Sequence, residues 1–425
     1  MRAYVAALQG SASRTIALAQ EALACLPERD AANRSFVSFT LGGACWLTGD
    51  LAGARRAFAE ASRLGEEAGN IHVAVPALGA LAYLHELSGQ LHQAAELHRN
   101  AIRLAAGQRG QSLPVAAQAH TGLGNLLYEW NDLATAAYHL ETASALVEML
   151  GQADTLVASQ IALARLRQAR GDWEAALKQT GKAEQVVGSV TLTPSTAALW
   201  AAHQMRMALV RGGPASAARL AQDRGLALSE DYQPLRAPEY LMLARVRLAQ
   251  GEPDAAQALL ARLLPPTESA GQMGRVIELL MLEALTLQAK GDLPKALTAL
   301  GRALALAEPE GYMRMFLDEG APMAELLRHA GSRGIAPKYV AKLLSEFDKV
   351  SGVVPTTNQP LIEPLSDREL EVLRLLAAGK SNQEIAAELV LATGTVKRHL
   401  NNIFGKLSVQ SRTECAVRAR ELGLL

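Results

Sequence analysis

Aromatic residues, cysteines and net charge are all scarce in this sequence of 425 residues. Aromatic residues make up 4% of it, whereas 49% is hydrophobic and alanine and leucine are abundant, which is typical of closely packed helices rather than sheets. The net charge is zero, which excludes a global field that would draw the whole chain to nucleic acid. Any binding of nucleic acid must therefore depend on a local excess of basic residues.

The three cysteines, Cys25, Cys45 and Cys415, are odd in number and far apart. This spacing favours reduced thiols in a cytoplasmic protein over a disulfide framework or a metal site. The longest uncharged stretch, residues 110–128, contains one proline and three glycines, so we expect no membrane span. The sequence shows no signal peptide.

Patterns typical of catalytic or cofactor sites are also missing. No Ser-His-Asp set, HExxH pattern or glycine-rich loop stands out, so we expect no enzyme, no catalytic or metal-binding residues and no cofactor. Gly379-Lys380-Ser381 ends like a nucleotide-binding P-loop, but position 374 is arginine where that loop needs glycine. Nucleotide binding is therefore not expected at this segment.

A helix break of the form Gly-polar-x-x-x-Ala recurs through the first 300 residues. Glycine accepts the left-handed backbone that ends a helix, aspartate caps the next helix, and the alanine allows two helices to approach closely. Successive breaks are 39 to 42 residues apart, at Gly10, Gly49, Gly89, Asn131, Gly171, Gly212, Gly251 and Gly291.

The regular breaks predict helical hairpins that stack into a superhelical solenoid. A single hairpin cannot bury its own apolar face, so about eight copies must pack against one another. The alternative is an alanine-rich bundle with glycines placed by chance, which the near-constant spacing disfavours. The sequence therefore predicts an all-α fold in which the solenoid covers residues 1–307.

The repeat stops after Ala307, and the rest of the chain divides into three parts. Residues 308–350 are predicted to form short closing helices at 312–317, 323–329 and 339–350. Prolines at 355, 360 and 364 predict an extended linker over residues 351–364. Residues 365–425 are then a small four-helix domain.

Three Ser-x-x-Glu capping boxes, beginning at Ser366, Ser381 and Ser411, predict helix starts in this last domain. Residues 390–392 form a short turn before the third helix, which is expected to begin near Thr393 or Gly394. This arrangement of two short helices around a tight turn is typical of a helix-turn-helix.

The third helix has an apolar face and a basic face. At about 100° per residue, the apolar residues fall in one narrow sector and should face the core: Val396, Leu400, Ile403 and Leu407. Arg398 and Asn401 lie opposite, where arginine can read guanine and asparagine can read adenine. Lys397 lies on one flank, a position suited to a phosphate.

Positive charge is concentrated around this helix. No acidic residue occurs between Leu389 and Thr413, whereas Lys397, Arg398, Lys406 and Arg412 supply four positive charges. The alternative is an ordinary solvated helix with a Lys-Arg pair. The missing acids and the capped helices favour DNA, with phosphate contacts expected from Ser381, Thr393, Thr395, Asn402, Lys406, Ser411 and Arg412.

The terminal motifs resemble the LuxR-type helix-turn-helix. The resemblance covers about sixty residues and includes Leu365-Ser366-Asp367-Arg368-Glu369, Gly379-Lys380-Ser381-Asn382-Gln383-Glu384-Ile385-Ala386 and Thr395-Val396-Lys397-Arg398-His399-Leu400. It implies that Lys397, Arg398 and Asn401 face the bases. It also implies a dimer contact through the last helix, at Thr413, Val417 and Arg420. Ala392 departs from the family, which often has a serine cap there.

The repeat array resembles the tetratricopeptide-type repeats of MalT-like regulators, through its period and its Gly-Asp-Leu-x-x-Ala pattern. Such regulators usually carry an ATPase domain ahead of the repeats, and this sequence shows none. The resemblance implies an inducer such as a sugar, although no residue here identifies one.

Together these features predict a transcription regulator that binds double-stranded DNA as a homodimer or higher assembly. A small molecule or a protein partner is expected in the groove of the solenoid. One alternative is a protein-binding scaffold whose terminal module never meets DNA. Another is a regulator that binds DNA without responding to any effector.

Overall fold

A computed structural model describes the chain as two compact units, Met1–Ser351 and Gly352–Leu425. Apart from one isolated bridge between Ala106 and Ser112, every regular element of the described residues is a helix, which confirms the predicted all-α fold. The described residues are 2–3, 6, 11–107, 111–226, 233–351, 367–377, 379–389, 391–407, 412, 415 and 419. The predicted linker lies outside them except for Ser351, and the finer division of the chain stays a prediction.

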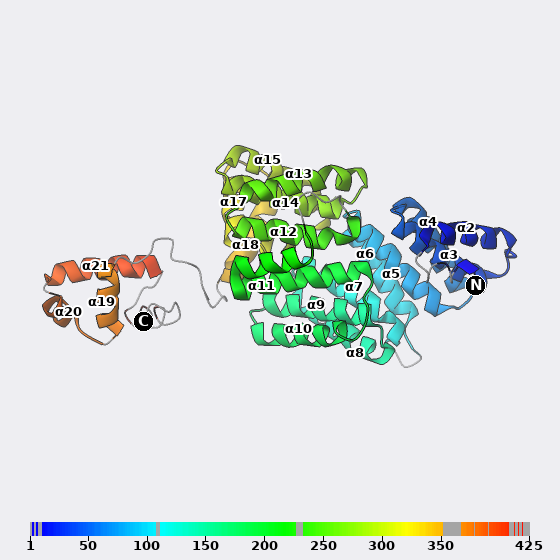
Figure 1. Ribbon diagram of the computed structural model, residues 1–425, viewed down its shortest axis with the longest axis horizontal. Coiled ribbons are helices and arrows are strands. Elements are labelled where there is room, and N and C mark those ends of the chain that lie inside the picture. The colour runs from blue at the N-terminus through cyan, green and yellow to red at the C-terminus, as the bar shows by residue number, and fades with distance from the viewer. Residues whose placement is uncertain are drawn as a thin grey trace. The chain divides into compact units, whose positions relative to one another are not determined.

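The first unit is a stack of antiparallel helical hairpins, as predicted, and Figure 1 shows them side by side. Helix α2 (Ala12–Cys25) precedes the first described hairpin. The paired helices are α3 (Ala31–Leu47) with α4 (Leu51–Glu67), α5 (Ile71–Leu87) with α6 (Leu91–Leu104), α7 (Ala117–Glu129) with α8 (Leu133–Leu150), α9 (Ala153–Ala169) with α10 (Trp173–Val187), α12 (Ala237–Ala249) with α13 (Pro253–Ser269), and α14 (Met273–Ala289) with α15 (Leu293–Ala307). Helix α11 (Pro194–Asp223) bends at Gly213 and forms a hairpin by itself. Short 3-10 turns, η1 (Pro114–Ala116) and η2 (Pro234–Arg236), precede α7 and α12.

The predicted breaks between paired helices adopt the left-handed backbone. The φ angle is positive at Gly49, Gly89, Asn131, Gly171, Gly251 and Gly291. The aspartate that follows then caps the second helix: Asp50 accepts a hydrogen bond from the Gly53 N–H (2.8 Å) and Asp172 from the Ala175 N–H (3.0 Å).

One predicted break was placed a residue too early. Gly213, not Gly212, has the positive φ of 74°. The reason is Pro214, because proline disfavours a right-handed helical conformation in the residue before it. The first predicted break, at Gly10, lies outside the described residues.

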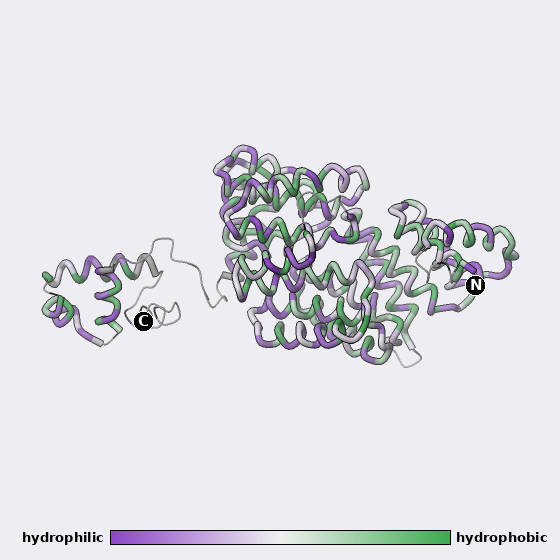
Figure 2. The backbone as a smooth tube through the Cα atoms, viewed as in Figure 1, coloured by the Kyte–Doolittle hydropathy of each residue, from purple (hydrophilic) through white to green (hydrophobic). Residues whose placement is uncertain are grey.

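The alanine five residues after each predicted break is completely buried. It has 0% exposure in every described hairpin, at Ala54, Ala94, Ala136, Ala176, Ala217, Ala256 and Ala296. Figure 2 shows hydrophobic and hydrophilic segments alternating along the helices of this unit. A small side chain at this position lets the paired helices approach closely, so the repeat pattern directly encodes the packing.

The solenoid ends in a closing segment that returns to an earlier repeat. This segment comprises η3 (Glu308–Glu310), α16 (Arg314–Leu317), α17 (Ala321–Ser332) and α18 (Pro337–Ser351). The Trp130 indole Nε1–H donates to the Glu310 carbonyl oxygen (2.8 Å), and the Met313 N–H donates to the Glu129 carbonyl oxygen (3.1 Å). Parts of the chain about 180 residues apart are thereby held together.

The second unit contains α19 (Asp367–Ala377), α20 (Asn382–Glu388) and α21 (Thr393–Leu407). These helices surround a separate apolar core that includes Val372, Leu376 and Ile385. Residues 412, 415 and 419 are helical among the described residues near the C-terminus, and Cys415 and Ala419 are buried in the same core. None of the described helices in either unit is long and apolar enough to cross a membrane.

Candidate functional sites: a nucleic-acid interface and the solenoid interior

Helix α20 begins with the predicted capping box. The Ser381 hydroxyl accepts a hydrogen bond from the Glu384 N–H, and the Glu384 carboxylate accepts one from the Ser381 N–H. The Glu384 pKa is lowered because its carboxylate accepts the backbone and side-chain hydrogen bonds of Ser381. The other two predicted boxes, at Ser366 and Ser411, lie outside the described residues.

Helix α21 follows α20 after a tight turn. The Leu391 N–H donates back to the Ala386 carbonyl oxygen (2.8 Å), and the Thr395 N–H donates to the Ala392 carbonyl oxygen (2.9 Å). The helix begins at Thr393, within the predicted range. This short connection fixes how α20 and α21 cross, and both helices contribute to the same core.

The inward face of α21 is the predicted one. Val396 and Ile403 have 0% exposure and Leu400 has 5%, and all three pack in the core of the second unit. The side chain of Leu407 lies outside the described part. Because these residues fix the rotation of the helix about its axis, they also decide which residues point away from the core.

Two basic residues of α21 point away from the core and have no bonding partner in the described part of the chain. Lys397 and Arg398 are exposed, and no hydrogen bond or ion pair joins either of them to another described residue. Thr393 and Asn402 are also exposed, whereas Thr395 is half-buried. The backbone of α21 includes Asn401 and Lys406, whose side chains lie outside the described part.

Three other basic residues of this unit, Arg368, Lys380 and Arg412, make structural contacts. The Arg368 guanidinium donates to the Leu389 carbonyl oxygen (2.6 Å), and Lys380 pairs with Glu388 (3.2 Å). Arg412 donates to the Lys380 carbonyl oxygen and to the Asn382 side-chain oxygen (3.2 Å). Arg368 and Arg412 therefore hold the two ends of α20 in place, a role that the sequence pattern did not predict.

Four predicted site residues cannot be placed, because Ser411, Thr413, Val417 and Arg420 lie outside the described residues. The proposed dimer helix and one phosphate contact therefore stay predictions. Ser381 is exposed at the start of α20, on the same unit as Lys397 and Arg398.

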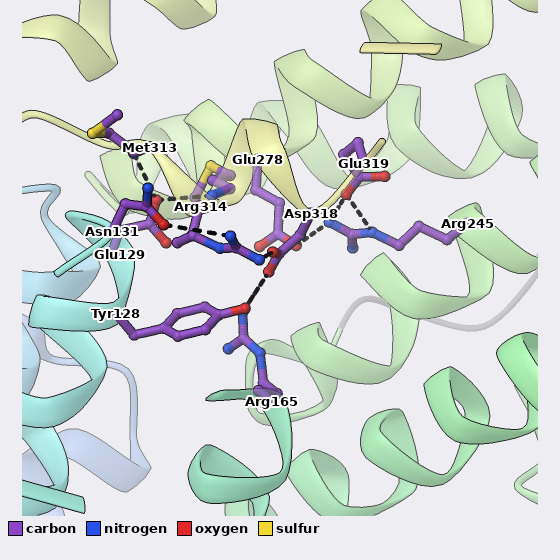
Figure 3. A network of polar contacts seen from close by, with 11 residues as sticks. Tyr128, Glu129, Asn131, Arg165, Arg245, Glu278, Met313, Arg314, Asp318 and Glu319 are labelled. Atoms are coloured by element: carbon purple, nitrogen blue, oxygen red, sulfur yellow. Dashed lines mark hydrogen bonds and ion pairs between the residues drawn. The ribbon is translucent and has the colours of Figure 1, made fainter. Parts of the chain in front are cut away.

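A second group of polar residues lies inside the solenoid, where the closing segment meets α7, α9 and α12 (Figure 3). Asp318 accepts a hydrogen bond from the Tyr128 hydroxyl (2.8 Å) and pairs with Arg314 (2.5 Å) and, at 3.5 Å, with Arg165. Burial alone would raise the pKa of Asp318, but Arg314 and Arg165 hold it below its ordinary value.

Arg245 and Glu129 complete this network. The Arg245 guanidinium pairs with Glu278 (2.8 Å) and Glu319 (2.7 Å), as Figure 3 shows for the residues drawn as sticks. The Glu129 carboxyl group accepts hydrogen bonds from the N–H groups of Met313 (3.2 Å) and Met315 (2.9 Å). Burial raises the pKa of Glu129 to about 7.

Two adjoining cavities open beside the network. The polar cavity has a volume of about 380 Å³ and is lined by residues that include Arg165, Arg206 and Arg245. The apolar cavity has a volume of about 460 Å³, with Trp46 and Tyr83 in its wall. The sequence predicted a binding groove in the solenoid but named none of these residues.

Two families match this chain. The family described as "MalT-like TPR region" matches residues 1–333. The chain belongs to this MalT-like family. The family described as "Bacterial regulatory proteins, luxR family" matches residues 363–419, which include all three described helices of the second unit.

A curated relative matches across both units. It is the HTH-type transcriptional regulator MalT of Vibrio cholerae serotype O1, which is 24% identical over 449 residues. The match covers 99% of this chain and 49% of the relative. The MalT-like chain described here therefore spans about half the length of that protein.

Two solved structures are similar to parts of the chain. BtubC from P. vanneervenii is 20% identical with a TM-score of 0.28, and the match covers 63% of this chain and 93% of BtubC. The second is a STAND protein with a tetratricopeptide repeat sensor from Pyrococcus horikoshii. It is 14% identical with a TM-score of 0.40, and the match covers 81% of this chain and 54% of that protein.

Proposed function

We propose that this chain is a DNA-binding transcription regulator whose helix α21 enters the major groove. The observation that carries the proposal is the exposure of Arg398, opposite the buried face of α21, and of Lys397 on its flank. Neither has a bonding partner among the described residues. Exposed cations on a helix held by a tight turn are the arrangement that a reading helix needs. The luxR-family match over residues 363–419 supports the same conclusion.

The finer contacts belong to the same proposal. Lys397, Arg398 and Asn401 contact base edges, and the phosphate contacts come from the ends of α20 and α21 and from the start of the last helix. A pair of modules then binds adjacent half-sites, with Thr413, Val417 and Arg420 in the dimer contact. Two-fold pairing would place the two reading helices about one turn of DNA apart.

The solenoid is proposed as the part that receives an effector or a protein partner. Its interior contains the two cavities described above, and its repeats offer a long inner surface. Binding there favours one self-associated form of the chain, and that form brings two modules together on DNA. The effector acts only as far as its affinity differs between the two forms.

The salt dependence of duplex binding by the full chain tests this proposal. If each module neutralises four phosphates, log K falls with log salt with a slope near −3.6 per module. A protein-binding scaffold predicts instead that the chain has no salt-dependent affinity for duplex DNA. A flat response would therefore favour the scaffold and remove the electrostatic part of the argument.

A further inference from the structure

Arg206 lies inside the solenoid and has no bonding partner among the described residues. It comes from α11 and lines the polar cavity, and no hydrogen bond or ion pair joins it to another described residue. Its neighbour Arg165 is only partly satisfied, because its Nε is buried without an acceptor in the described structure. Burial lowers the pKa of Arg206, and the positive charges of Arg165 and Arg245 lower it further.

Every carboxylate that lines this cavity already has another partner. Glu278 and Glu319 share Arg245, and Asp318 binds Arg314, Arg165 and the Tyr128 hydroxyl. Glu86 pairs with His98 (3.0 Å), and Glu129 accepts two backbone N–H groups. Arg165 and Arg245 are each paired with a lining carboxylate, so among the described residues Arg206 is left without a carboxylate at hydrogen-bond distance.

This arrangement is unfavourable for an empty cavity. A desolvated charge costs free energy unless it is paired and hydrogen-bonded, and nearby like charges increase the cost. An anion from solution would give Arg206 the partner that it lacks among the described residues. A guanidinium also matches the planar geometry of a carboxylate and the oxygens of a phosphate.

The adjoining apolar cavity indicates the other half of the ligand. Trp46 and Tyr83 lie in its wall with their rings packed edge-on, 5.4 Å between centroids. Tyr83, Leu199, Pro238 and Arg275 line both cavities, so the apolar space continues from the charged one. Each cavity has the size expected of a small-molecule site.

We propose that the solenoid interior binds an organic anion, with its acidic group on Arg206 and its apolar body against Trp46 and Tyr83. The proposal rests on the proposed function, in which the solenoid receives an effector, and it names the chemical class of that effector. An uncharged ligand would leave Arg206 unpaired, and a small inorganic anion would leave the apolar cavity unused.

The test uses the full chain without DNA and a set of matched probes. The probes are 4-phenylbutyrate, its neutral amide 4-phenylbutanamide, phenyl phosphate and inorganic phosphate, compared at constant ionic strength by calorimetry and by thermal unfolding. We expect 4-phenylbutyrate or phenyl phosphate to bind and to raise the unfolding temperature, and the amide and inorganic phosphate to bind far more weakly. The two organic arms distinguish a carboxylate from a phosphate as the acidic group.

Two substitutions on α11 make the test specific. Arg206→Gln should weaken binding of the organic anion about tenfold or more, the loss expected when a charged hydrogen-bond partner is removed. Arg211→Gln is the matched control, because Arg211 is exposed on the same helix and does not line either cavity. It should leave the affinity unchanged.

The ligand-free protein gives an independent result. Since Arg206 has no partner among the described residues, Arg206→Gln should raise the unfolding temperature of the chain without ligand. If Arg206 instead stabilised the fold, the same substitution would lower the unfolding temperature. Three results would overturn the proposal: a lower unfolding temperature of the ligand-free variant, no binding of either organic anion, or binding of the amide as tightly as 4-phenylbutyrate. Duplex binding measured on the same preparations tests the proposed function separately. If the chain binds DNA but none of the organic anions, only this inference is refuted.

Discussion

Neutralising Asp318 should destabilise the solenoid more than neutralising any surface carboxylate. Asp318 joins the closing segment to α7 and α9, since it binds the Tyr128 hydroxyl, Arg314 and Arg165. The side chains of Asp318 and Arg314 are 10% and 6% exposed. Asp318→Asn keeps the shape of the side chain but leaves a buried guanidinium without its counter-charge.

The structure sets the expected magnitude. Removing one partner of a buried ion pair typically costs about 3–5 kcal/mol, because the remaining charge stays desolvated. Asp254→Asn is the control, since Asp254 pairs with Lys290 at 2.6 Å but is 87% exposed. An exposed pair of this kind contributes about 0–1 kcal/mol.

Urea unfolding of the full chain, followed by far-ultraviolet circular dichroism, measures both free energies of unfolding. Asp318→Asn should lower the urea midpoint far more than Asp254→Asn. The double variant Arg314→Met with Asp318→Leu should recover part of the loss, because it removes both buried charges. Equal, small effects of the two single substitutions would refute the view that this network closes the solenoid.

Three further predictions follow from the same contacts. Gly171→Ala should lower the stability of the chain by about 1–2 kcal/mol because φ is +77° there. Gly181→Ala, in helical backbone with open space around it, should instead raise the stability by about 0.4–1 kcal/mol. Thermal unfolding measures both effects, and shifts of the unfolding temperature in the same direction would contradict the prediction. The folded-state pKa of Glu129 is about 7, above its ordinary value of 4.5, so the contribution of Glu129 to stability is complete below pH 4.5 and is lost as pH rises through 7. The stability of Glu129→Gln should fall less steeply across this window, and parallel stability curves for the two proteins would disprove the shift. Lys397→Ala should weaken duplex binding, whereas substitution of another exposed lysine, Lys342→Ala, should not. A salt slope reduced by about 0.9 assigns Lys397 to a phosphate, and a loss of affinity confined to one base pair assigns it to a base. Unchanged duplex binding contradicts both assignments.

The local features of the fold could be predicted from the sequence because they depend on nearby residues. A glycine followed by aspartate ends one helix and caps the next, as at Gly171 and Asp172. The rotation of α21 follows from the spacing of Val396, Leu400 and Ile403 alone. Even the misplaced break had a local signal, since Pro214 restricts the residue immediately before it.

The interior network could not be predicted in the same way. Asp318 meets Tyr128 across 190 residues of sequence, and a repeat pattern does not say where the superhelix returns on itself. One signal was available: Arg165, Arg245 and Glu278 interrupt helices that are otherwise rich in buried apolar residues. Charged residues in an apolar stripe indicate a buried polar site, although they do not identify its partners.

The structural roles of Arg368 and Arg412 show a related difficulty. Arg412 lies in the segment whose positive charge suggested DNA contacts, yet it donates to a backbone carbonyl oxygen near one end of α20, as Arg368 does at the other end. Sequence spacing cannot separate an arginine that holds a helix end from one that remains available to a phosphate. Lys397 and Arg398 differ from Arg368 and Arg412 because the buried face of α21 points their side chains away from the core.

The base preference of Arg398→Ala tests the central claim most directly. A duplex selected by the full chain from a random pool is changed at each position in turn, and the affinities of the wild-type chain and the variant are compared. We expect Arg398→Ala to lose about 1–3 kcal/mol of discrimination at one base pair and to keep the base preferences of the wild-type chain at the other positions. A uniform loss of affinity across all sequences, or no change at all, would contradict the assignment of α21 as the reading helix.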